Sequence, residues 1–124
     1  MNGKLVPAII LMAVLTFAGS AVAHHGVAEY DMTKISTLKG TVTKFDFANP
    51  HAMIDLAVKT DSGVEQWRVE SNSPNLLTRA GWTRNSLKPG DQITVIGHAT
   101  KKGTKLIRLV KIVFASGQVL SPGG

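Results

Sequence analysis

Histidine is the residue type in this sequence best suited to chemistry, and the four copies are His24, His25, His51 and His98. A chain that began at His24 would offer its free α-amine and the imidazole of the same residue as a chelating pair. The amine has a pKa near ~8 and loses its proton readily when a metal binds. A third nitrogen from His51 or His25 would complete a nitrogen-rich set, which suits Cu(II) better than other common ions. The pattern therefore predicts a copper site formed by His24, His51 and His25.

A structural interpretation of the same histidines stays open. A His-His pair at a chain start can be a loose polar end, and His51 can bond its ring to the backbone of the turn Asn49-Pro50-His51. The sequence has no spaced His/Cys cluster of the kind that identifies a zinc site. We expect His98 to be an ordinary surface histidine on a strand.

The first 23 residues are organised like a secretory signal peptide. Lys4 supplies a positive charge, residues 5–18 form an apolar run, and alanines occupy the −3 and −1 positions of a cut after Ala23. A membrane anchor is the alternative, but a spanning helix needs ~20 apolar residues, and this run is shorter and contains Pro7. We therefore expect a periplasmic or secreted protein that begins at His24 and has no membrane span after cleavage.

Composition limits what this exported chain can be. There is no cysteine, so neither a disulfide framework nor a lipid-modified N-terminus is available. Removal of residues 1–23 leaves 101 residues, enough for one domain. It also leaves 13 Lys+Arg against 8 Asp+Glu, a formal charge of +5. That excess favours anionic surfaces but identifies no partner.

Hydrophobic periodicity predicts five strands and one short helix. The strands are expected over 38–47, 52–59, 64–70, 92–99 and 106–114. In the first strand Val42 has one parity and Phe45 and Phe47 the other, which requires a bulge near Thr43-Lys44. Between the third and fourth strands, Ser73-Pro74 and Gly81 are typical start and stop signals of a helix.

Three strands, a helix and two further strands is the order of an OB-type barrel. We therefore predict an all-β fold with one short helix, as a small five-stranded OB-type barrel, with an antiparallel sandwich as the alternative. Gly40 and Gly97 favour the barrel, because glycine within a strand often marks a tight bend or a bulge. The expected division is a signal peptide over 1–23, an N-terminal arm over 24–37, the barrel over 38–115 and a flexible tail over 116–124.

The aromatic and helical residues are expected to form part of the core. Trp67 and Trp82 are large enough to supply much of the interior of a small domain. Leu76, Leu77 and Ala80 should form the apolar face of the helix, with Trp82 folded back beneath it.

Several short motifs follow one another along the chain. They are Ala23-His24-His25, Leu38-Lys39-Gly40-Thr41-Val42, Asn49-Pro50-His51, Trp67 with Glu70, Ser73-Pro74-Asn75-Leu76-Leu77, Ala80-Gly81-Trp82 and Leu87-Lys88-Pro89-Gly90-Asp91. Together they resemble a family of small exported bacterial proteins known only as a domain of unknown function. The resemblance extends to about Phe114 and implies export and a single small β-rich domain. It draws attention to the two leading histidines and to the Asn-Pro-His motif, and it implies no activity.

Enzymatic and nucleic-acid functions find little support in the sequence. It contains no phosphate-binding loop, nucleophile elbow or HExxH helix, so we expect no enzyme activity. A basic hairpin near Lys101 and Lys102 could attract nucleic acid, but the outward row of the second strand has no aromatic residue for base stacking. We expect a binding protein, either for a metal ion, copper first, or as a metal-free docking module for an envelope protein or an anionic polymer.

Overall fold

The computed structural model describes residue 3 and residues 26–123 of the chain. His24, His25 and all of the predicted signal peptide except Gly3 lie outside the described residues. Within the described residues, no helix combines the length and the apolar character that are needed to cross a membrane.

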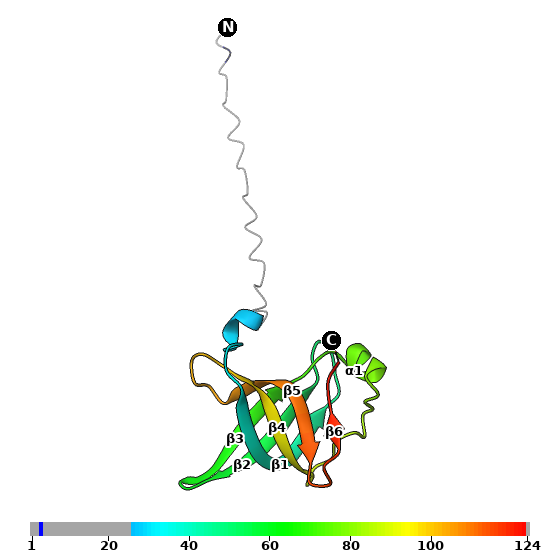
Figure 1. Ribbon diagram of the computed structural model, residues 1–124. Helices are drawn as coiled ribbons and strands as arrows, with labels where there is room; N and C mark the ends of the chain where they lie inside the picture. Colours follow the sequence, from blue (N-terminus) through cyan, green and yellow to red (C-terminus); the bar gives the residue numbers. More distant parts are fainter. Residues whose placement is uncertain (1–2, 4–25, 124) are drawn as a thin grey trace.

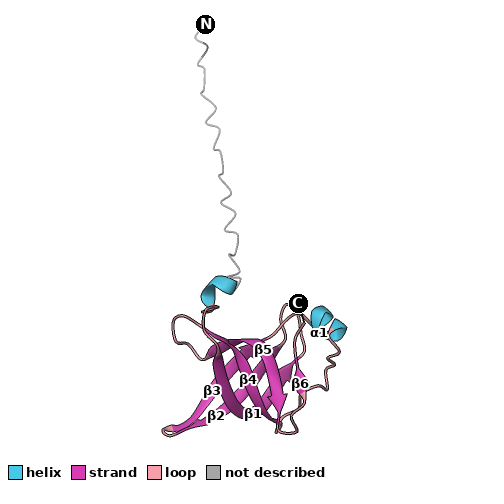
Figure 2. Cartoon of the chain, viewed as in Figure 1, coloured by secondary structure: helices cyan, strands magenta, loops and turns pink. Residues whose placement is uncertain are grey.

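The described residues form a β-barrel with a short helix at one end (Figures 1 and 2). The elements in chain order are the 3₁₀ turn η1 (Val27–Glu29), β1 (Ser36–Asp46), β2 (Met53–Thr60), β3 (Gly63–Glu70), α1 (Pro74–Arg79), β4 (Gln92–Ala99), β5 (Leu106–Phe114) and β6 (Val119–Leu120). The predicted bounds of β4 and β5 are confirmed, and those of β1, β2 and β3 differ by one or two residues.

Strand pairing closes the barrel and confirms the predicted OB-type fold. The strand order is β3-β2-β1-β4-β5-β6, and a further parallel pairing of β3 with β5 joins the two ends of the five-stranded set. The other pairings are antiparallel. Closure places β2, β3 and β5 side by side. The candidate site lies on the outer face of these three strands.

The first strand is shared by both halves of the barrel, as its sequence predicts. Its first part pairs with β4, and the part from Thr41 onward pairs with β2. Between Val42 and Lys44 the register with β2 shifts, so Thr43 is an extra residue. This bulge confirms the prediction and bends β1, which lets one strand follow the curvature of the barrel.

The two strand glycines lie where strands approach too closely for a side chain. A Cβ at Gly40 would lie 2.5 Å from the backbone oxygen of Ala57. At Gly97 it would overlap the backbone oxygen of Arg108, at the register shift between β4 and β5. Both positions therefore require glycine for steric reasons, which is consistent with the predicted bends.

Packing of α1 explains why its apolar face is narrower than expected. The Ser73 hydroxyl accepts a hydrogen bond from the Leu76 amide at 3.4 Å, as an N-cap does. Leu77 and the following Trp82 are buried in the core, as predicted. Leu76 and Ala80, which we placed on the same face, are exposed, because a helix of six residues covers the barrel end along only one side. Trp67 is half-buried against the core rather than inside it.

The C-terminal residues correct one part of the prediction. We expected 116–124 to be a tail without regular structure, yet β6 pairs with β5 and Leu120 packs against the core. The Trp82 indole N–H donates to the Ser121 carbonyl at 2.8 Å, and the Asn72 amide donates to Gly123 at 2.8 Å. The glycine and proline content suggested fraying, but pairing on the outer edge of β5 and a partner for a buried indole favour order here.

We predict that Gly97→Ala lowers the free energy of unfolding by about 2–3 kcal/mol, because the added methyl group must displace backbone rather than a flexible side chain. For a domain of this size the melting temperature should fall by roughly 10–20 °C. Gln92→Ala, at an exposed position of the same strand, is the control and should change it little. Equal melting temperatures for the two variants would contradict the steric role of Gly97.

Deletion of residues 119–124 should destabilise the domain by about 2–4 kcal/mol, since it exposes apolar surface under Leu120 and leaves the Trp82 N–H without an acceptor. Urea denaturation followed by tryptophan fluorescence would measure the loss. Ser121→Ala is a matched control with no expected effect, because Trp82 bonds to the backbone carbonyl of that residue. An unchanged urea midpoint for the truncated protein would show that residues 119–124 do not stabilise the domain.

Candidate functional site

An open cavity of about 500 Å³ lies on the outer side of the barrel, where β2, β3 and β5 meet. Its lining combines ionisable and apolar side chains: Glu29, Pro50, His51, Met53, Arg68, Glu70, Thr104, Lys105 and Leu106. The residues come from the arm before β1, the turn between β1 and β2, the loop between β4 and β5, and the ends of β2, β3 and β5. The cavity thus joins parts of the chain that are far apart in sequence.

The turn between β1 and β2 positions His51 at this cavity. The Asn49–Pro50 peptide is cis, and the chain enters β2 two residues after His51. Across the hairpin, Met53 pairs with Glu70, the last residue of β3, so the Glu70 carboxylate lies beside the imidazole. The distance from His51 Nδ1 to Glu70 Oε1 is 2.6 Å. Because a carboxylate only accepts, Nδ1 carries the hydrogen and Nε2 is the nitrogen left for a ligand.

Tyr30 contacts the other oxygen of the same carboxylate. Its hydroxyl donates to Glu70 Oε2, and both side chains are almost fully buried. Burial, together with the hydrogen bond to Glu70, raises the pKa of Tyr30 far above its ordinary value, so the phenol remains protonated and continues to donate. Two donors thus satisfy a buried carboxylate that would otherwise be costly to desolvate.

The arm that carries Tyr30 is attached to the barrel along its described length. Tyr30 forms a bridge with Thr100, and the Asp31 amide donates to Ala99 O at 2.9 Å. His98 Nδ1 lies 2.6 Å from the carbonyl oxygen of Lys34, so this histidine is half-buried and holds the arm. The arm was expected to be irregular over 24–37, but its described part contains η1, the bridge at Tyr30 and the first two residues of β1, and the barrel fixes its position.

Basic side chains at the cavity are partly neutralised by neighbouring groups. Arg68 Nε donates to Asp55 Oδ1 at 3.1 Å, and Lys105 Nζ lies 4.0 Å from Glu65 Oε2. These pairs are largely exposed and contribute little to stability. Both cationic side chains line the same cavity as His51, whose side chain is 43% exposed.

Only one of the three predicted metal ligands lies within the described residues. His51 lines the cavity, whereas His24 and His25 precede the first described residue of the arm. Among residues 26–123 no group of three His, Asp or Glu side chains could hold a metal ion by itself. The predicted copper site would therefore need nitrogen atoms from His24, with His51 or His25 as the third ligand.

The sequence reasoning did not identify the partners of His51. Glu70 entered the sequence analysis only with Trp67 in a motif, yet its carboxylate lies beside the His51 ring. The hairpin at 60–63 contained the necessary signal, because its register places Glu70 opposite Met53. Nothing in the aperiodic arm predicted the contact of Tyr30.

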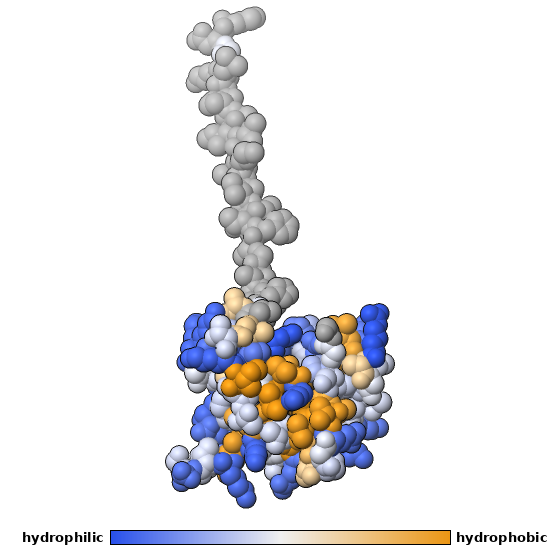
Figure 3. All heavy atoms as spheres, in the orientation of Figure 1, coloured by the Kyte–Doolittle hydropathy of each residue, from blue (hydrophilic) through white to orange (hydrophobic). Residues whose placement is uncertain are grey.

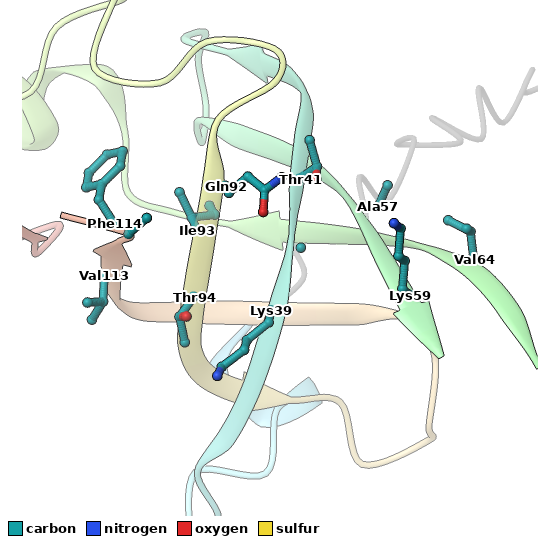
Figure 4. Close-up of a pocket in the computed structure, with 12 residues that line it drawn as sticks. Lys39, Thr41, Ala57, Lys59, Val64, Gln92, Ile93, Thr94, Val113 and Phe114 are labelled. Carbon is teal, nitrogen blue, oxygen red and sulfur yellow. The ribbon is translucent and has the colours of Figure 1, made fainter. Parts of the chain in front are cut away.

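A second hollow of about 370 Å³ lies across β1, β2, β4 and β5 (Figure 4). Its described lining includes Lys39, Lys59 and Thr94 but no histidine or carboxylate, so it does not suit a cation. Apolar side chains also gather on the face shown in Figure 3, and the exposed ones in the chain include Ile35, Val110 and Val119.

The comparisons with known proteins give a family but no activity. A family model described as a family of unknown function (DUF6152) matches residues 12–107, which extends from before the arm to the second residue of β5. This agrees with the resemblance to an uncharacterised family. No curated protein matches the chain.

Tyr30→Phe is expected to lower the free energy of unfolding by about 1–3 kcal/mol, because it removes a donor from a buried carboxylate. Combining it with His51→Ala should give a non-additive loss, since both side chains bond to Glu70. Urea denaturation of the two single variants and the double variant measures this coupling. Thr33→Ala, which changes an exposed hydroxyl of the same arm, is the control, and strictly additive losses would contradict a shared carboxylate.

Proposed function

The chain belongs to DUF6152, a family of unknown function, and we propose that it is an exported protein that binds Cu(II). The proposed ligands are the α-amine and imidazole of His24 with Nε2 of His51, and His25 is the alternative third nitrogen. The observation that carries the proposal is the contact of His51 Nδ1 with Glu70.

The His51–Glu70 pair has the arrangement that metal-binding histidines commonly use. A carboxylate that accepts from one ring nitrogen fixes the tautomer, orients the ring and makes the other nitrogen a stronger ligand. The partly exposed ring at the cavity mouth is open to an incoming ion. A histidine that only capped the turn would need no buried carboxylate at this position.

The position of the arm supports a contribution from His24. Tyr30 is anchored to the same Glu70 that holds His51, and Glu29 lines the same cavity. η1 occupies Val27–Glu29, so the part of the arm that can extend is short: His24 lies two residues before Gly26, the first described residue of the arm. Two residues span at most ~7 Å. The lining of the cavity by Glu29 of η1 is what supports an approach of the His24 amine to His51.

Export is part of the proposal because it creates the ligand. Cleavage after Ala23 would turn the His24 nitrogen from an amide into a basic amine, which can lose its proton and bind a metal. An amine with two imidazoles is a nitrogen-rich set, for which Cu(II) has the highest affinity among common divalent ions.

The second candidate function is a metal-free docking module. Lys39 and Lys59 at the second hollow favour an anionic polymer, and the exposed apolar residues Ile35, Val110 and Val119 favour an envelope protein. This function needs neither His24 nor His51, which makes the two candidates separable by experiment.

A protein that begins at His24 should bind one Cu(II) at least about tenfold more tightly than the same protein with a methionine before His24, a difference of about 1.4 kcal/mol. His51→Ala should weaken binding further, and Glu70→Gln by ~10–100-fold, as expected for a residue that orients a ligand. Isothermal titration calorimetry measures the affinities, and electron paramagnetic resonance reports the nitrogen ligands.

Gln92→Ala, at an exposed position of β4 that does not line the cavity, is the control and should leave the Cu(II) affinity nearly unchanged, with the fold checked by circular dichroism. Intact-mass measurement of the exported protein determines whether the chain begins at His24. Equal affinity for the native and the extended N-termini would exclude the amine as a ligand and favour the docking module.

A further inference from the structure

Met53 shares the candidate cavity with His51. The two residues are separated by Ala52, which is fully buried, so the alternation of side chains places both His51 and Met53 on the outer side of the barrel. Both line the 500 Å³ cavity. Its lining thus contains one imidazole with a free Nε2 and one thioether.

A thioether changes which ions the cavity prefers. Methionine sulfur is a soft ligand that selects Cu(I), whereas imidazole binds both oxidation states of copper. The chain has no cysteine, so methionine is its softest ligand. After residue 23 there are two methionines, and the other one, Met32, is 46% exposed and does not line the cavity.

Packing alone accounts poorly for a methionine at this position. Methionine usually fills irregular gaps in an apolar core. Met53 is half-buried and is not part of the core cluster or of the apolar residues packed against it. The next outward position of β2 holds Asp55, which is paired with Arg68, so Met53 lies in a polar row beside Glu70.

We infer that the cavity also binds Cu(I), with His51 Nε2 and Met53 Sδ as ligands. The inference rests on the proposed copper function, but it does not depend on the His24 amine. The Cu(II) set relies on nitrogen from the chain start, whereas the Cu(I) pair lies within the described barrel. The cavity thus offers a different ligand set for each oxidation state, and His51 is common to both sets.

The test is a competition for Cu(I) against bicinchoninate, under anaerobic conditions with ascorbate, on the protein that begins at His24. Met53→Leu keeps the size and apolar character of the side chain but removes the sulfur, and it should weaken Cu(I) binding at least about tenfold. Its Cu(II) affinity should stay unchanged. His51→Ala should weaken the binding of both ions.

Met32→Leu is the control and should alter neither affinity. X-ray absorption of the Ag(I) form, a probe without redox chemistry, should show a sulfur neighbour in the native protein and in Met32→Leu but not in Met53→Leu. Circular dichroism checks that each variant is folded.

Two outcomes would overturn the inference: an unchanged Cu(I) affinity in Met53→Leu, or an equal loss in Met32→Leu. Either result leaves the Cu(II) proposal standing if the native start still binds more tightly than the extended one. Conversely, equal Cu(II) affinity for the two N-termini, with a selective loss of Cu(I) in Met53→Leu, would refute the amine ligand and support the cavity pair.

Discussion

The buried carboxylate of Glu70 is the group on which the organisation of the candidate site depends. It lies at the end of β3, where the barrel closes onto β5, and it accepts from Tyr30 on one oxygen and from His51 on the other. A carboxylate in this position is stable only while it keeps its donors. Its burial therefore requires both the arm and the turn before β2 to lie against the barrel.

Strands and their order were predictable because they follow local patterns. Alternation identified β4 and β5 with their observed bounds, and the parity change between Val42 and Phe45 located the bulge in β1. Gly40 and Gly97 indicated a tight bend or a bulge. In contrast, β6 has only two residues and lies among glycine, serine and proline, so its order depends on the β5 edge and on Trp82. Such tertiary contacts leave no periodic signal.

The candidate site was also predictable only where local sequence patterns determine it. His51 stood out because its residue type and its turn are visible in the sequence. Glu70 could have been found from the register of the hairpin, which places it opposite Met53. The role of Tyr30 could not, because the arm has no period and its position is set by hydrogen bonds to Ala99 and Thr100. Contacts between side chains that are far apart in sequence, such as Tyr30 and Glu70, can be identified only from the closed barrel.

Under the proposed copper function, sharing one carboxylate would link ligand binding to arm docking. Burial of Tyr30 already orders the arm. The chain therefore loses less conformational entropy when a ligand joins its start to His51. The coupling is reciprocal: a ligand that binds only the docked arm stabilises the docked state by the same free energy. A barrel that fixed His51 but left the arm free would lose this advantage. The Tyr30–Glu70–His51 arrangement is therefore better suited to a binding site that assembles from two segments than to a simple turn cap.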